Sequence, residues 1–191
     1  MQHSVNTSAL LLAAGNGTRF GGDKLLAPVE PNQLPMGLQS ANSIAPHVAN
    51  LICITRPHDQ ALIQIFQNEG YTCIPNPDYH TGLASSIVTG LKRIPDQHNL
   101  MIVLADMPFI SRQNFDEFFH FISQAPDCIA RPYFEENPGH PVYFPAAFRD
   151  ELLQLKGDQG AQAILRTQEI RKFQVNHPHF CKDVDRVSDL A

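Results

Sequence analysis

The sequence predicts an α/β fold: a three-layer α/β/α sandwich around a mostly parallel, Rossmann-like sheet. Short apolar runs alternate with longer amphipathic stretches, which is the pattern of strands joined by crossover helices. Three of the first four runs are almost continuously apolar, as expected of parallel strands covered by helices on both faces. The 191 residues contain no internal repeat and no interdomain linker, so we expect one domain over residues 1–191.

The first two thirds of the chain predict four strands and four helices. The strands are expected at Ala9–Ala14, Leu51–Thr55, Tyr71–Ile74 and Leu100–Ala105, and the helices at Leu38–Val48, Asp59–Glu69, Ala84–Arg93 and Arg112–Ser123. Gly70 stands where a helix C-cap glycine is common, and Ser111 is well placed as an N-cap.

After Asp127 the alternation is weaker. We expect strands at Cys128–Arg131 and Pro141–Phe144 around a loop at Tyr133–His140, then helical pieces near Ala146–Leu155 and Ala161–Arg166, and a strand at Arg171–Val175.

Charge and cysteine content exclude some function classes. The net charge is −5 and the 14 Lys and Arg are dispersed, which argues against nucleic-acid or anionic-membrane partners. The four cysteines form no Cys-x-x-Cys pair, so a thiolate zinc site is not expected, and Cys53 and Cys128 are predicted to be small core residues. The N-terminus has no basic region before a short apolar run, which predicts a cytoplasmic protein.

A glycine-rich loop follows the first predicted strand. In a parallel sheet, ligands bind beyond the carboxyl ends of the strands, and glycines let backbone N–H groups approach an oxyanion. Arg19 and Lys24 add cations suited to a triphosphate. A solvated turn remains the alternative. A P-loop is disfavoured because Leu25 follows Lys24, and a dinucleotide motif because the second strand ends some forty residues after Gly15.

A carboxylate follows the fourth predicted strand, in the turn Asp106-Met107-Pro108. Mg²⁺ prefers hard oxygen ligands, few from protein and the rest from water and phosphate, so Asp106 is a candidate metal ligand. The alternative is a cap of the next helix, for which Ser111 is the better residue.

These elements resemble the MobA-like nucleotidyltransferases, which include molybdenum cofactor guanylyl- and cytidylyltransferases and share the fold of nucleotide-diphospho-sugar transferases. The resemblance implies that the loop wraps the triphosphate, that Arg19 and Lys24 contact phosphates, and that Asp106 binds the metal. It is carried by the loop Leu12-Ala13-Ala14-Gly15-x-Gly17-x-Arg19-x-Gly21-x-x-Lys24 and by Leu104-Ala105-Asp106-Met107-Pro108.

Further matches follow in the family's order. Gly82-Leu83-Ala84-Ser85-Ser86 implies that Ser85 and Ser86 bind the nucleotide, with helix capping as the alternative. Gly139-His140-Pro141 implies an acceptor pocket, although His140 could be a packed strand-edge histidine. Asp158 is a second acceptor candidate or an N-cap, and Asp185 is a second metal ligand or part of an acidic tail.

The chain departs from the family pattern at two places. After Val29 it reads Glu30-Pro31-Asn32-Gln33-Leu34-Pro35-Met36 in place of a Gly-x-Pro-Leu turn, a departure on the acceptor side of the expected cleft. Arg186-Val187 replaces a Thr-Pro pair after Asp185, without removing a predicted ligand.

The resemblance leans toward the cytidylyltransferase branch because Ala13-Ala14-Gly15 replaces the Ala-Gly-Gly of the guanylyl branch. It implies Mg²⁺-dependent CMP transfer from CTP to molybdopterin cofactor, with the product passed to a molybdoenzyme. Lys24, Arg19 and Asp106 are the predicted catalytic residues; no general base is needed, and the nine histidines stay unassigned. The open alternatives are GTP as donor, a sugar or alditol phosphate as acceptor, a non-catalytic cofactor carrier, and a nicotinamide-dependent oxidoreductase.

Overall fold

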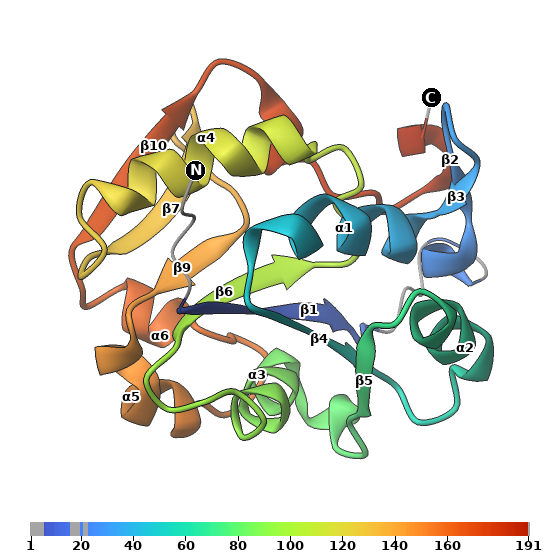
Figure 1. Ribbon diagram of the computed structural model, residues 1–191, viewed down its shortest axis with the longest axis horizontal. Helices are drawn as coiled ribbons and strands as arrows, with labels where there is room; N and C mark the ends of the chain where they lie inside the picture. The colour runs from blue at the N-terminus through green and yellow to red at the C-terminus, as the bar shows by residue number, and fades with distance from the viewer. Residues whose placement is uncertain (1–5, 16–19, 21–22, 191) are drawn as a thin grey trace.

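The computed structural model describes residues 6–15, 20 and 23–190 (Figure 1). One eight-stranded sheet has the order β10-β7-β9-β6-β1-β4-β5, with β8 paired to β7, and β2 and β3 form a small separate ribbon. The strands are β1 (Thr7–Ala13), β2 (Pro28–Val29), β3 (Leu34–Pro35), β4 (Asn50–Thr55), β5 (Thr72–Pro75), β6 (Asn99–Leu104), β7 (Ile129–Phe134), β8 (Asn137–Pro138), β9 (Val142–Phe144) and β10 (Ile170–Val175).

The sheet is mostly parallel, as predicted. β1 pairs in parallel with β4 and β6, β4 with β5, and β7 with β10, whereas β9 runs antiparallel between β6 and β7. The four early strands and the three later ones agree with the predicted runs to within a few residues. The loop expected at Tyr133–His140 instead contains β8, which folds back on β7 as a short hairpin.

Helices cover both faces of the sheet and confirm the three-layer prediction (Figure 1). On β1, Ala9, Leu11 and Ala13 pack under α1, α2 and α4, whereas Leu10 and Leu12 pack toward α3, α5 and α6. This alternation explains the continuously apolar runs, because a strand buried on both faces needs apolar residues at every position. The helices are α1 (Met36–Ile44), α2 (Gln60–Asn68), α3 (Leu83–Leu91), α4 (Arg112–Ser123), α5 (Arg149–Leu153) and α6 (Gln162–Leu165).

Local signals at helix ends are confirmed. Ser111 accepts a hydrogen bond from the N–H of Asn114, and the Asn114 side chain accepts from the N–H of Ser111, which closes a capping box at α4. Gly70 has a φ of +82° after α2, and the N–H groups of Gly70 and Tyr71 donate to Gln67 and Phe66, as in a Schellman motif.

Two cysteines that were both predicted to be core residues differ in burial. Cys53 lies in β4 and is fully buried, as predicted. Cys128 is exposed, so its prediction as a core residue is wrong. The reason is that β7 begins one residue later, at Ile129, and Cys128 lies in the turn that connects α4 to that strand.

Candidate active site

A cavity of about 780 Å³ lies at the carboxyl ends of β1, β4 and β6. Because these three strands run parallel, the residues that follow them meet at one edge of the sheet. Eight residues predicted from sequence line it: Leu12, Ala13, Ala14, Gly15, Lys24, Ser86, Asp106 and Asp158. Gly17 and Arg19 lie outside the described residues.

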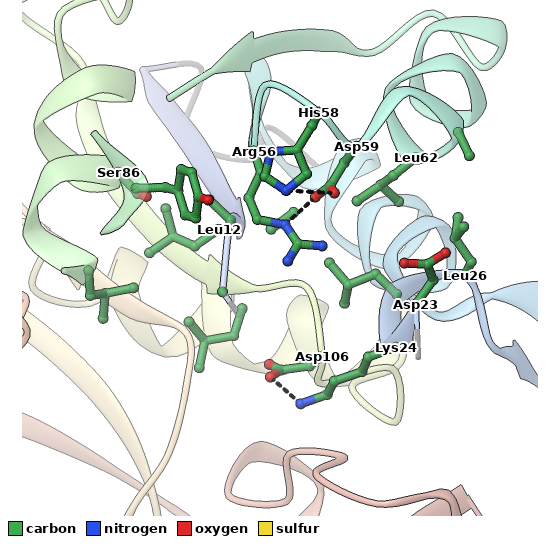
Figure 2. Close-up of a pocket in the computed structure, with 18 of the residues that line it drawn as sticks. Leu12, Asp23, Lys24, Leu26, Arg56, His58, Asp59, Leu62, Ser86 and Asp106 are labelled. Carbon is green, nitrogen blue, oxygen red and sulfur yellow. Dashed lines mark hydrogen bonds and ion pairs between the residues drawn. The ribbon is translucent and has the colours of Figure 1, made fainter. Parts of the chain in front are cut away.

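Lys24 joins two carboxylates at this edge. It lies in the 3₁₀ turn Lys24–Leu26 and is only 8% exposed. Its ammonium donates to Asp106 Oδ2 at 2.8 Å (Figure 2). It also donates to Asp185 Oδ1 at 3.4 Å. A cation buried to this degree needs compensating charge, and the two aspartates supply it. Three residues far apart in sequence thus form one cluster of charged groups.

The C-terminal segment reaches the cluster through a backbone contact and a small apolar core. The N–H of Val184 donates to the carbonyl oxygen of Asp106 at 2.9 Å, and the fully buried Val184 side chain packs with Val29 and Met36. The Asp189 carboxylate then accepts from the N–H groups of Asp185 and Arg186. The local contacts of Asp189 and the long-range contact of Val184 together fix the backbone at Asp185.

The residues around Lys24 fit a divalent cation. Asp106 and Asp185 converge on one positive charge, and their side chains are 28% and 42% exposed. Asp106 also lines the cavity. Within residues 6–15, 20 and 23–190, no group of three or more His, Cys, Asp or Glu could hold a metal. Two carboxylates are nevertheless sufficient for Mg²⁺, which usually completes its shell with water and substrate phosphates.

The described end of the glycine-rich loop leaves room for a ligand. A Cβ added at Gly15 would meet no heavy atom of the described residues within 4 Å. Leu12, Ala13 and Ala14 line the cavity directly before it.

The paired serines differ in their contacts. Asn76 is fully buried, and its side-chain amide donates to Ser85 Oγ at 2.8 Å and to Ser86 Oγ at 3.0 Å. Ser85 in turn donates to the carbonyl oxygen of Gly82 at 2.8 Å, so it accepts one hydrogen bond and donates another within the protein. Ser86 lines the cavity, and its hydroxyl proton has no acceptor among the described residues. Neither serine caps α3, whose N-cap position is Gly82.

Asp158 lies against the start of α3. A Cβ added at Gly82 would come within 2.5 Å of Asp158 Oδ1, and Gly82 has a φ of +112°. The N–H of Ala84 donates to the carbonyl oxygen of Gly157. Asp158 does not cap α6, whose N-cap is Ala161 without a side-chain hydrogen bond. The cavity face of Asp158 remains available to a ligand.

The Gly139-His140-Pro141 segment lies between β8 and β9 and is not among the residues that line this cavity. The N–H groups of Gly139 and His140 donate to the carbonyl oxygens of Pro132 and Phe180, and Gly139 accepts from Arg131 Nε at 2.7 Å. Burial and the nearby Arg131 guanidinium lower the pKa of His140 to about 4, so its imidazole is neutral at pH 7. The acceptor role of these residues stays a prediction.

Several cavity residues were not identified from the sequence, and four of them follow a strand. Arg56, His58 and Asp59 follow β4, and Tyr79 follows β5; all four line the cavity. Figure 2 shows the first three across the cavity from Lys24 and Asp106. The signal that would have found Arg56 is its position directly after a strand, since the same reasoning selected Asp106 after β6.

A ligand cavity at the carboxyl ends of the strands is typical of open α/β sheets. The chain belongs to the MobA-like NTP transferase family, whose domain matches residues 9–173. By that membership it is a nucleotidyltransferase.

The chain is also similar to other known proteins and solved structures along most of its length. The chain is 25% identical over 168 residues to nicotine blue oxidoreductase of Paenarthrobacter nicotinovorans, covering 83% of this chain and 81% of the relative. It is 22% identical over 183 residues to molybdenum cofactor cytidylyltransferase of Escherichia coli (strain K12), covering 95% and 92%. The fold is similar to that of Rv0371c from Mycobacterium tuberculosis H37Rv, with a TM-score of 0.79, 20% identity, and 97% and 96% of the two chains covered. A manganese complex of Rv0371c is also similar, with a TM-score of 0.77, 20% identity and the same coverage.

Among the described residues, no helix is both long and apolar enough to cross a bilayer.

Proposed function

We propose that this protein transfers CMP from CTP to molybdopterin cofactor and releases pyrophosphate, with Mg²⁺ as its metal. The observation that carries the proposal is the Lys24 ammonium held between Asp106 and Asp185 at the mouth of the strand-end cavity. The similarity to a molybdenum cofactor cytidylyltransferase along 95% of the chain supports the choice of acceptor. The similarity to a protein that crystallised with manganese supports a divalent metal.

In this reaction an acceptor phosphate oxygen attacks the α-phosphorus of CTP, and the bond to the pyrophosphate oxygen breaks. Lys24 is placed to offset negative charge that develops on the phosphoryl oxygens and the leaving group. Asp106 and Asp185 would hold Mg²⁺, which supplies further charge neutralisation when bound. A phosphate nucleophile is already ionised at neutral pH, so no histidine is required as a base.

The remaining cavity residues would bind and orient the substrates. Backbone from Leu12 to Gly15 borders the nucleotide, and Ser86 offers a hydroxyl proton to it. Asp158 faces the cavity from the opposite loop, where an acceptor could meet it. Arg19 and Gly17 are proposed phosphate contacts on the family resemblance alone, and Gly139, His140 and Pro141 are proposed as part of the acceptor side on the same ground.

Pyrophosphate release tests the proposal. Wild-type protein with Mg²⁺, CTP and molybdenum cofactor should release pyrophosphate. Asp106→Asn should lower the rate of release by orders of magnitude. Asp183→Asn, at an exposed position, is the control and should leave the rate unchanged. A non-catalytic carrier would bind the cofactor and release nothing.

Ligand selectivity tests the choice of nucleotide. Because a ligand that binds only the folded state raises the melting temperature, CTP, GTP, ATP, UTP and NADP⁺ can be compared with and without Mg²⁺. A Mg²⁺-dependent rise with GTP alone would keep the chemistry and change the donor. The alternative is an oxidoreductase, the activity in the name of one relative. Stabilisation by NADP⁺ and by no triphosphate would favour that alternative and refute nucleotidyl transfer.

A further inference from the structure

We propose that Arg56 selects the nucleobase, by donating two hydrogen bonds to adjacent acceptor atoms of cytosine. The inference rests on the proposed function and names a specificity residue that lies across the cavity from Lys24 (Figure 2).

The guanidinium of Arg56 is held in place and partly unused. Its Nε donates to Asp59 Oδ2 at 2.7 Å, and its side chain is 22% exposed. Neither terminal nitrogen has a hydrogen-bond partner among the described residues. Figure 2 shows these nitrogens directed into the cavity. Arg56 therefore presents a fixed pair of donors to whatever ligand enters.

The orientation of Asp59 supports a role in holding that side chain. Asp59 is the N-cap residue of α2, a position where an aspartate ordinarily accepts from a helix N–H. Here its side chain makes no cap hydrogen bond and contacts Arg56 instead. Its own side chain is only 12% exposed. The carboxylate thus positions the guanidinium and leaves the N-terminus of α2 without a side-chain cap.

The order of the strands places Arg56 at the right distance for a base. Asp106 follows β6 and Arg56 follows β4, with β1 between them. Two strand spacings correspond to roughly 10 Å, about the separation between the α-phosphate and the far edge of the base in a nucleotide. A nucleotide with its phosphates at Lys24 would lie across the end of β1 and direct its base toward Arg56. The apolar side chains of Leu12, Leu26 and Leu62 line the same cavity and can contact the base faces.

Hydrogen-bonding chemistry then favours cytosine. The guanidinium carries donors only. Cytosine presents N3 and O2 as adjacent acceptors, whereas uracil presents an N3–H donor beside O2, which repels a second donor. Adenine likewise places its N6 amino donor beside N1. Guanine could meet Arg56 only through its O6 and N7 edge. CTP and UTP therefore form the sharpest pair of probes, since their triphosphates and riboses are identical.

The experiment measures dissociation constants for CTP and UTP with Mg²⁺ by calorimetry in wild type, Arg56→Ala and Arg56→Lys. Wild type should bind CTP about tenfold or more tightly than UTP, in line with the discrimination that one bidentate contact provides. Arg56→Ala should bring the ratio close to one by weakening CTP alone. Arg56→Lys should also lose most of the preference for CTP over UTP, because an ammonium lacks the planar pair of donors of a guanidinium.

Control variants separate a failure of this inference from a failure of the function. Lys24→Ala should weaken CTP and UTP equally and leave their ratio unchanged. Asp59→Ala should give an intermediate ratio, since it frees Arg56 without removing it. An unchanged CTP to UTP ratio in Arg56→Ala, or equal weakening of both nucleotides, would overturn the assignment of Arg56. If wild type binds neither nucleotide, the proposed function itself fails.

Discussion

Two regions of the protein carry motifs of the same family, yet they use their polar groups differently. The first is the edge of the sheet at the carboxyl ends of β1, β4 and β6, and the second is the segment between β8 and β9. At the first edge, Lys24, Asp106 and Arg56 face a cavity, and a Cβ added at Gly15 would meet no atom of the described residues within 4 Å. At the second, Gly139 and His140 make backbone hydrogen bonds with Pro132 and Phe180. The difference indicates that polar groups of the first region are available to a ligand, whereas the backbone groups of the second are already bonded within the protein.

The largest expected effect tests the chemical side of this comparison. Lys24→Ala should lower the rate of pyrophosphate release by about 10²–10³-fold, because it removes a preorganised charge near the reacting phosphate. Lys156→Ala, at an exposed position, is the matched control and should leave the rate unchanged. A near-normal rate in Lys24→Ala would remove this residue from the mechanism.

Two glycine substitutions test the structural side. An added Cβ at Gly139 would lie 2.7 Å from the carbonyl carbon of Phe180 and 2.9 Å from Cys181 Sγ, so the backbone must shift. We expect Gly139→Ala to lower the free energy of unfolding by about 2–3 kcal/mol, measured by urea denaturation. Gly15→Ala should change it by less than about 1 kcal/mol, since the added Cβ would meet no atom of the described residues within 4 Å. Equal destabilisation by both would contradict the distinction.

The pH dependence of stability should come partly from His140. Its pKa is about 4 in the folded protein against an ordinary 6.5, so the unfolded chain binds more protons between these values. Stability from this group is complete above pH 6.5 and is lost as pH falls toward 4, by at most about 3 kcal/mol.

Urea denaturation at pH 7.5 and pH 5 measures that loss, and His140→Gln should reduce the difference between the two. The same difference in wild type and His140→Gln would show that other groups cause it.

The smallest expected effect distinguishes the paired serines. Ser86→Ala should weaken CTP binding by roughly two- to tenfold, because it removes one donor that faces the cavity. Ser85→Ala should leave CTP affinity unchanged and cost about 1 kcal/mol of stability, since both hydrogen bonds of Ser85 are internal. Calorimetry and urea denaturation check the two halves. The reverse pattern would exchange their roles.

Much of the fold was predictable because its signals are local. A strand buried on both faces must be apolar throughout, which identified β1, β4 and β6, and the caps at Ser111 and Gly70 depend on residues within one turn. The error at Cys128 arose because an apolar run does not show where a strand begins. Asp106 was identifiable as a site candidate because it lies just beyond β6, and Lys24 because it belongs to the glycine-rich segment that follows β1.

What the sequence by itself determined is the layered α/β fold, the edge of the sheet that holds the cavity, and the residue types available there. Only the tertiary structure decided which of them meet. Asp185 reaches Lys24 through the buried Val184 and its hydrogen bond to Asp106, a contact across most of the chain. Arg56 faces the cavity because β4 lies beside β1 and Asp59 turns toward it. Such long-range contacts depend on packing and strand order, and local sequence patterns do not specify either.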